Sequence, residues 1–122
     1  MTAYDEAVQR YFAAWNAESA EQLAEAVAAA FTEDAGYTDP LAAVRGHDGL
    51  VAVIDGARQQ FPGFAFRPHG SPDGHHDLVR FGWELVSVAD GSAPVAGFDV
   101  ITLAEDGRIS SVSGFLDRLP AA

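Results

Sequence analysis

Hydrophobic residues in the first half of the chain recur at every third or fourth position, which is the spacing of one face of an α-helix. This pattern predicts a first helix over residues 4–15 and a third over about 48–60, which a Pro-Gly step ends. Between them, a second helix begins at Ser19, and its apolar face continues to Phe31. Gln22, three residues after Ser19, completes a pattern typical of a capping box.

The second half has the short runs of β-branched and aromatic residues that are typical of strands. We expect strands over residues 64–66, about 76–88, 95–104 and 108–119. Asp-Gly steps at 90–91 and 106–107 predict turns between the last three strands, and residues 69–75 are the longest predicted loop. An earlier extended segment at 35–39 precedes Pro40, which disfavours helical geometry in the residue before it.

Helices followed by strands predict an α+β fold. We expect a single domain over residues 1–122, in which three N-terminal helices pack on a curved, mainly antiparallel sheet. In the long strand at 76–88, every second residue from Val79 to Leu85 is apolar, so this face is the core side. A curved sheet that wraps over helices leaves a concavity at its open end, and an apolar, aromatic-lined concavity suits a small molecule.

Composition narrows the range of partners and chemistry. Of the 122 residues, 48% are hydrophobic, which is enough to build one core. Eighteen acidic and seven basic residues give a formal net charge of −11, which disfavours nucleic acid and membrane surfaces as partners. The absence of cysteine leaves carboxylates, imidazoles, hydroxyls and the backbone to supply any chemistry. No apolar run is long enough for a membrane span or a signal peptide, so we expect a cytoplasmic protein.

Three polar residues lie in apolar surroundings and are the candidates for catalysis. Tyr11 is in the middle of the apolar face of the first helix, so its hydroxyl needs either a partner in the core or a ligand. Asp39 precedes Pro40, where it either caps a turn or enters the pocket. Asp99 interrupts a strand that is apolar on both faces, where a carboxyl resists ionisation. Its alternative is a buried carboxyl that the backbone or an arginine such as Arg80 satisfies.

The four histidines indicate little chemistry. His69, His75 and His76 lie on a predicted loop, without the helical spacing that brings two imidazoles onto one ion, so no metal site is predicted. His47 lies near the start of the third helix, where it either caps the helix or lines the mouth of the pocket. The sequence contains no nucleophile elbow, phosphate-binding loop or dinucleotide fingerprint, which disfavours acyl-enzyme, nucleotide and redox-cofactor chemistry.

The order of elements, over essentially the whole chain, resembles the nuclear transport factor 2-like superfamily, whose members are cone-shaped domains with an interior cavity. Within that superfamily, residues 8–16 look like the first helix of bacterial ketosteroid isomerases, and Tyr11 falls on their catalytic tyrosine. Thr38-Asp39-Pro40 resembles the step that carries their general base. Phe98-Asp99 matches the position of their protonated oxyanion-hole aspartic acid.

The known mechanism of that family implies roles for the three residues. Asp39 would take a proton alpha to a ketone and return it at the gamma carbon, while Tyr11 and neutral Asp99 would hydrogen-bond the dienolate oxygen. The resemblance also implies a small apolar ketone or polyketide-like ligand, with no cofactor and no metal. The expected substrate-binding residues are His47 and Asp117 at the rim and an apolar wall of Trp15, Phe31, Phe61, Phe66, Trp83, Phe98 and Phe115.

The resemblance also implies a homodimer, because members of the superfamily often dimerise through the convex face of the sheet. Arg80 and Glu84 alternate with the core residues of their strand and so lie on that outer face. We expect them to form a pair that is either solvated or faces the partner.

Three short segments look more like the broad SnoaL-like branch of the superfamily, which includes polyketide cyclases: residues 82–85, 106–109 and 114–117. An epoxide hydrolase of the limonene type is disfavoured, because Gly97 stands where that family has an arginine two residues before the aspartate. A dehydratase of the scytalone type would need inward-pointing histidines, for which His47 and His76 are the candidates. Three hypotheses stay open: a ketosteroid-isomerase-like enzyme, a polyketide cyclase or dehydratase, and a non-catalytic binding or dimerisation module.

Overall fold

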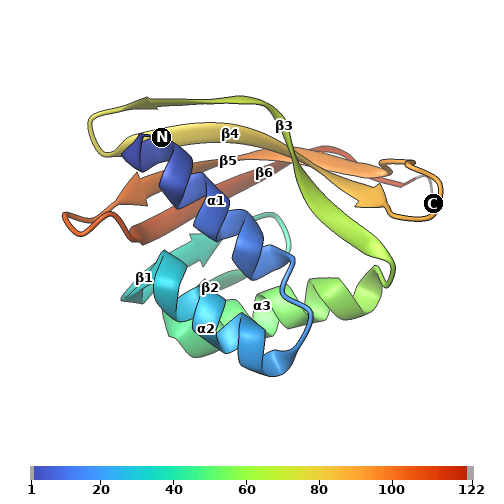
Figure 1. Ribbon diagram of the computed structural model, residues 1–122, viewed down its shortest axis with the longest axis horizontal. Helices are drawn as coiled ribbons and strands as arrows, with labels where there is room; N and C mark the ends of the chain where they lie inside the picture. The colour runs from blue at the N-terminus through green and yellow to red at the C-terminus, as the bar shows by residue number, and fades with distance from the viewer. Residues whose placement is uncertain (1, 121–122) are drawn as a thin grey trace.

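Three helices and a curved sheet form two layers in the computed structural model, which describes residues 2–120 (Figure 1). The helices are α1 (Ala3–Trp15), α2 (Ala20–Ala30) and α3 (Gly46–Gln60). The strands are β1 (Phe31–Thr38), β2 (Ala43–Arg45), β3 (Phe64–His75), β4 (Leu78–Ser87), β5 (Val95–Leu103) and β6 (Ile109–Arg118). Within the described residues these strands form a sheet in the order β2-β1-β6-β5-β4-β3, with β1 and β6 parallel and the other pairs antiparallel. The predicted α+β fold is confirmed.

Side-chain caps fix where the first two helices begin. Thr2 accepts a hydrogen bond from the Asp5 N–H at 3.1 Å and donates its own N–H to the Asp5 carboxylate at 3.3 Å, so α1 starts with a capping box. Ser19 accepts from the Gln22 N–H as predicted, but the Gln22 side chain accepts from Glu18 instead of Ser19. None of the helices in residues 2–120 is long and apolar enough to cross a membrane.

Elements around β1 differ from the prediction in their bounds. β1 begins at Phe31 directly after α2, because the backbone of Phe31 is already extended (φ −120°, ψ 146°). The strand β2 is too short to show an alternating pattern and was not predicted. α3 begins at Gly46, two residues earlier than predicted, and the positive φ of 85° at this glycine lets the chain turn into the helix.

The predicted loop at residues 69–75 is wrong, because these residues continue β3 as far as His75. β3 is an outer strand of the sheet, where prolines are tolerated because their missing N–H need not face a neighbour. The pairing with β4 shifts between His69 and Asp73, so the prolines and glycines here produce an irregular strand. The chain then turns into β4 at His76, which has a positive φ of 51°.

The two faces of β4 separate the core from the surface as predicted. Val79, Phe81 and Leu85 are buried beneath the sheet. Val79 and Phe81 belong to the core cluster that includes the helices, whereas Trp83 and Leu85 line a cavity.

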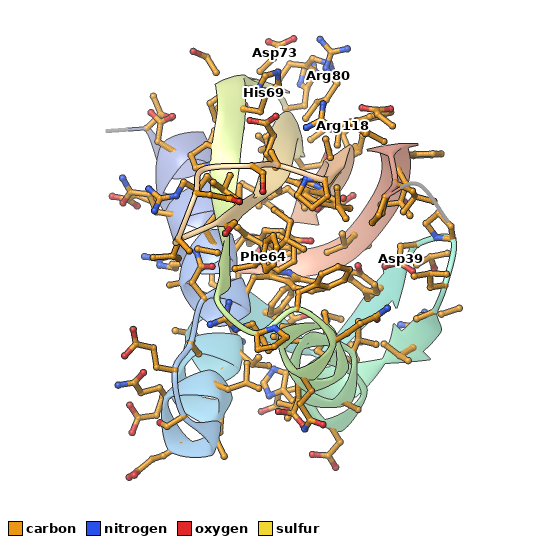
Figure 2. The ribbon with its side chains drawn as sticks, turned by 90° about the vertical axis from the view of Figure 1, so that its right-hand side faces the viewer. Asp39, Phe64, His69, Asp73, Arg80 and Arg118 are labelled. Carbon is orange, nitrogen blue, oxygen red and sulfur yellow. The ribbon has the colours of Figure 1, made fainter. Side chains whose placement is uncertain are left out.

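The predicted pair of Arg80 with Glu84 on the outer face is wrong. Arg80 lies 3.9 Å from Asp73, whereas Glu84 pairs with Arg118 at 2.9 Å and with His69 at 3.4 Å. His69 and Asp73 lie on the neighbouring strand β3, and Arg118 lies on β6, from which it reaches Glu84 across Ala96 of β5. Side chains on paired strands lie closer together than side chains four residues apart on one strand. Figure 2 shows His69, Asp73, Arg80 and Arg118 gathered well away from Asp39.

Candidate active site

A cavity of about 400 Å³ lies between the helices and the concave face of the sheet. Its volume is within the usual range of small-molecule sites, roughly 300–1,000 Å³. Four of its lining residues carry ionisable groups: Tyr11, Tyr37, Asp39 and Asp99. The other described lining residues are apolar or glycine, apart from Gln60, and none is a lysine, arginine or histidine. The site therefore has a small polar region in an apolar surround.

Tyr11 and Asp99 form the more deeply buried pair. The Tyr11 hydroxyl donates to Asp99 Oδ2 at 2.6 Å, and Trp83 Nε1 donates to Asp99 Oδ1 at 3.3 Å. Tyr11 and Asp99 are 3% and 4% exposed, so both are almost withdrawn from water. The alternative in which Arg80 satisfies Asp99 is wrong, because Arg80 points to the opposite face of the sheet and contacts Asp73.

Burial changes the protonation of this pair. Loss of water contact raises the pKa of Asp99 to about 6, the nearby charge of Asp39 adds to this rise, and the donors Tyr11 and Trp83 oppose it. Burial also raises the pKa of Tyr11 well above its ordinary value of 10, with the charge of Asp99 acting in the same direction. Tyr11 therefore stays a neutral donor, while Asp99 changes its charge close to neutral pH.

Asp39 is held by three donors at the end of β1. Its Oδ1 accepts from the backbone N–H groups of Leu41 and Ala42, both at 2.8 Å. Its Oδ2 accepts from the Tyr37 hydroxyl at 2.6 Å. Both interpretations of this residue hold, because the same carboxyl caps a turn before β2 and lines the cavity.

Tyr37 is a residue of the site that sequence reasoning missed. It is 4% exposed, and burial together with its hydrogen bond to Asp39 raises its pKa above the ordinary value of 10. A signal for it was present, since residues two apart on a strand point to the same side, which places Tyr37 beside Asp39.

Gly114 lies between the two carboxyls. A Cβ atom at this position of β6 would lie 2.7 Å from Asp99 Oδ1 and 3.4 Å from Asp39 Cβ. Such a contact with Asp99 is too short for a side chain to occupy. The glycine thus allows Asp39, which directly follows β1, and Asp99, on β5, to approach each other across β6.

Aromatic rings form one wall of the cavity. Phe66 packs against Trp15 and Trp83, with ring centroids 4.9 and 5.4 Å apart. Asn16, directly after α1, fixes this wall by bonding both the N–H and the carbonyl of Phe66 at 2.8 and 2.9 Å. Trp15 Nε1 is buried without a hydrogen-bond partner among the described residues, and it lies toward Tyr11, whose pKa rise it opposes.

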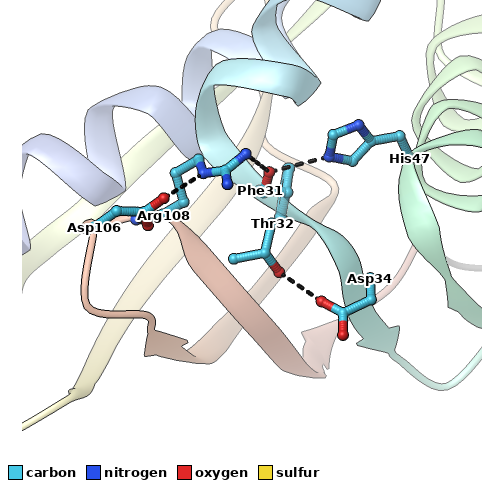
Figure 3. A network of polar contacts seen from close by, with 6 residues as sticks. All are labelled: Phe31, Thr32, Asp34, His47, Asp106 and Arg108. Atoms are coloured by element: carbon cyan, nitrogen blue, oxygen red, sulfur yellow. Dashed lines mark hydrogen bonds and ion pairs between the residues drawn. The ribbon is translucent and has the colours of Figure 1, made fainter.

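Of the predicted wall and rim residues, Trp15, Phe61, Phe66, Trp83 and Phe115 line the cavity. Phe31 instead lies fully buried in the core, at the junction of α2 and β1. His47 is turned away from the cavity, with Nε2 3.0 Å from the Phe31 carbonyl. Arg108 donates to the same carbonyl at 3.3 Å, so both side chains satisfy the end of α2 (Figure 3).

Phe98 and Asp117 also lie outside the cavity. Phe98 is on the outer face of β5, where its ring stacks on Phe115 at 5.0 Å and 14°. Asp117 is exposed at a break in register, since Ala96 pairs with Arg118 and the next residue of β5 pairs with Leu116. This bulge leaves Asp117 without a cross-strand partner residue on β5 and redirects the end of β6 toward the cavity opening.

The histidines do not converge on the site. His69 lies beside Glu84 on the outer face, and the rings of His75 and His76 are 6.0 Å apart at the turn between β3 and β4. In residues 2–120, no three histidine, aspartate or glutamate side chains are grouped so that they could hold a metal ion. A dehydratase chemistry based on His47 or His76 therefore has no support in the cavity lining.

Comparison with known proteins gives one consistent family. A model of the SnoaL-like domain matches residues 8–112. The solved structure of a candidate isomerase of the SnoaL-like family from Agrobacterium tumefaciens is 44% identical, covers 96% of this chain and 99% of its own, and has a TM-score of 0.89. No curated protein sequence matches the chain.

Two candidate polyketide cyclases, both 20% identical, share the fold. The protein from a Jannaschia species has a TM-score of 0.76 over 94% of this chain and 85% of its own. The protein from Sinorhizobium meliloti has a TM-score of 0.70 over 93% and 99%. The predicted resemblance is confirmed at the level of the family, and the chain belongs to the SnoaL-like domain family.

Proposed function

We propose that the chain is an acid–base enzyme that needs no cofactor and that moves a double bond in an unsaturated ketone. The observation that carries this proposal is the meeting of two tyrosine–aspartate pairs at Gly114, in the polar region of an otherwise apolar cavity. The 44% identity to a candidate isomerase supports the same class of reaction.

Asp39 is the proposed base. Two backbone N–H groups hold its Oδ1, which fixes the plane of the carboxylate and leaves Oδ2, beside Tyr37, to face a substrate. Oδ2 takes a proton from the carbon alpha to the ketone and returns that proton to the gamma carbon. Substrate and product then have the same composition, so the step requires no co-reactant.

Tyr11 and Asp99 are the proposed stabilisers of the dienolate oxygen. The Tyr11 hydroxyl now donates to Asp99, so the substrate oxygen has to join or replace Asp99 as its acceptor. A protonated Asp99 adds an O–H donor of its own, and burial favours that form below about pH 6 by raising the pKa of the carboxyl. Donors in a site withdrawn from water stabilise a developing oxyanion strongly.

A polyketide cyclase or dehydratase is the second candidate, and the direction of the Tyr11 hydrogen bond favours it. A carboxyl that accepts from a tyrosine and from Trp83 is suited to act as a base once it is ionised. In that case Asp99 removes the proton and Asp39 serves as the partner acid. A purely structural role for the carboxyls is less well supported, because neither Asp39 nor Asp99 forms a salt bridge within the described residues.

The test is turnover of a 5-ene-3-ketosteroid, followed by the absorbance of the conjugated enone that the isomerisation produces. We expect the wild-type chain to be at least about 100-fold faster than Asp39→Asn, because general base catalysis contributes about 10²–10⁴. Asp34→Asn is the matched control, since Asp34 is exposed on the same strand and bonds Thr32 outside the cavity.

Equal rates for wild type and Asp39→Asn would overturn the isomerase proposal. Cyclisation or dehydration of an aromatic polyketide ester, with no turnover of the steroid and loss of activity in Asp99→Asn, would establish the second candidate instead. Tight binding of either compound without turnover would indicate a binding domain.

A further inference from the structure

We propose that the natural ligand is a neutral molecule with a single ketone oxygen at one end and an apolar carbon skeleton longer than the cavity. The skeleton extends out of the cavity over a rim formed by Leu41, Phe115 and Leu119. This inference deepens the proposed function and rests on it for the position of the head beside Asp39 and Tyr11. The position of the body rests on the rim itself.

The distribution of exposed apolar side chains marks the rim. The large hydrophobic residues that are exposed within residues 2–120 are Leu41 (82%), Val88 (68%), Leu119 (61%), Phe115 (50%) and Leu78 (37%). The three that we assign to the rim all line the cavity, whereas Leu78 and Val88 do not. Apolar surface therefore continues from the cavity to the outside at its opening, which is typical of a ligand-binding groove.

The rim is tied to the proposed base. The N–H of Leu41 donates to Asp39 Oδ1 at 2.8 Å, so the residue that carries the rim on one side also orients the carboxylate. Leu119 directly follows the end of β6 at the opening. Phe115 continues the apolar surface from the opening to the outer face, where its ring stacks on Phe98 of the paired strand β5. A ligand with its head at Asp39 can thus extend over Leu41 without leaving apolar surface.

The polarity of the cavity restricts the head. Asp39 and Asp99 both line it, and the described lining residues include no cationic side chain to neutralise an anion. A carboxylate or phosphate head would be repelled in a site of low dielectric. A ketone oxygen, by contrast, accepts from tyrosine hydroxyls at no cost in charge.

The two tryptophans of the chain, Trp15 and Trp83, both line the cavity, so intrinsic fluorescence reports binding at this site. We would titrate the full chain with 2-octanone, 2-decanone and 2-dodecanone. A fully buried methylene strengthens binding by about fourfold, so a half-covered rim should give about twofold for each added carbon once the tail reaches it.

The rim variant combines Leu41→Ser with Leu119→Ser, both outside regular strands, so that folding is little affected. We expect wild-type affinity for 2-octanone but a loss of the gain with chain length, about tenfold for 2-dodecanone. The matched control combines Leu78→Ser with Val88→Ser, which are exposed apolar residues off the rim, and should retain the wild-type series.

An equal loss of affinity for all three ketones in the rim variant, or an unchanged dependence of affinity on chain length, would contradict the proposed role of the rim. Absence of binding by any alkanone would overturn the ligand class. Sedimentation of both variants tests the other occupant, a second copy of the chain: a dimer that dissociates only in the rim variant, with an unchanged ketone series, assigns the rim to a protein contact. The isomerase assay and the ketone titration are separate measurements: absence of isomerase activity contradicts the proposed function, whereas an unchanged ketone series in the rim variant contradicts the rim.

Discussion

Each carboxyl in the cavity is paired with a tyrosine hydroxyl at 2.6 Å, but the two carboxyls differ in their surroundings. Asp99 is almost fully buried, and its remaining donor is the indole of Trp83. Asp39 is only partly buried and is held by two backbone donors as well. Environments that differ in this way allow two carboxyls of one site to take different roles.

Tyr37→Phe tests whether the hydroxyl at Asp39 Oδ2 matters for catalysis. Loss of a donor to a charged acceptor is worth about 1.5–3 kcal/mol, so we expect kcat/KM to fall by about 10- to 100-fold. Tyr4→Phe is the control, since Tyr4 donates to the His76 carbonyl outside the cavity. An unchanged kcat/KM in Tyr37→Phe would show that Tyr37 only packs.

The charge of Asp99 gives the two candidate reactions opposite pH dependences. Its pKa is raised from 3.8 to about 6, so the carboxyl is neutral below about pH 6 and ionised above it. An isomerase that uses neutral Asp99 as a donor should lose kcat/KM as the pH rises through about 6. A cyclase that uses Asp99 as a base should gain activity over the same range.

Asp99→Asn separates these cases, because the amide cannot ionise. In the isomerase, the variant should show no fall in kcat/KM through pH 6. A wild-type rate that climbs with pH through 6, and that Asp99→Asn abolishes, would reject the donor role of Asp99.

Sequence reasoning located these carboxyls because each interrupts an apolar pattern or precedes a proline. Tyr37 lies in the same short segment and gave no such contrast, since a tyrosine on a strand is ordinary. Phe31 and Phe98 show the opposite error, because they were predicted to line the cavity and lie outside it. Each is an aromatic residue in an apolar run, but Phe31 faces the core and Phe98 the outer surface, and periodicity does not distinguish a cavity wall from a filled core.

Among the elements, β6 determines the shape of the site although it supplies no polar side chain to it. Gly114 has no side chain and so leaves room for the Asp99 carboxyl from β5. The break in register at Gly97 brings the end of β6 to the opening of the cavity. A Cβ at Gly97 would overlap the Phe115 carbonyl oxygen and lie 2.8 Å from the Trp83 ring. An arginine at this position is thus excluded by packing, which agrees with the disfavoured epoxide hydrolase.

Gly114→Ala should damage the site more than the fold. The added methyl group would lie 2.7 Å from Asp99 Oδ1, so the carboxyl has to move away from Tyr11. We expect at least about a tenfold loss of kcat/KM with a stability loss of about 1–3 kcal/mol, measured by urea unfolding. Ser113→Ala, an exposed neighbour on the other face of β6, is the control. Full activity in Gly114→Ala would mean that Asp99 does not need its present position.

The strand β3 shows why some elements resist prediction. Its Pro68, Gly70 and Pro72 are typical of a loop, yet the segment pairs with β4 on either side of an irregularity. Local composition does not reveal that a strand lies at the edge of a sheet, where proline is tolerated. The helices were better predicted, because their caps and apolar faces are local features of the sequence.

At the scale of the whole molecule, the parallel pairing of β1 with β6 brings together site residues that are far apart in the sequence. Asp39 follows β1 near the start of the sequence, and Gly114 lies on β6 near its end. No local pattern predicts a pairing over such a separation, so the sequence alone indicated two separate carboxyls, whereas the resemblance implied one site. The fold supplies the convergence.

The negative charge of the whole molecule and that of the cavity both disfavour an anionic ligand. The chain has a formal net charge of −11, and both carboxyls of the cavity lie without a cationic neighbour in its described lining. At pH 8, where a fatty acid is ionised, we expect 2-dodecanone to bind at least about tenfold more tightly than dodecanoic acid, measured by tryptophan fluorescence.

Salt distinguishes the two sources of this preference. Added salt screens the distant surface charges but not the carboxyls within the cavity, so the preference for the ketone should shrink and still persist at high salt. Asp39→Asn should reduce the part that persists, because it removes one of the two charges that face the ligand. Equal binding of ketone and acid at low salt would contradict a neutral ligand, and would require a cationic group at the opening that the described lining does not contain.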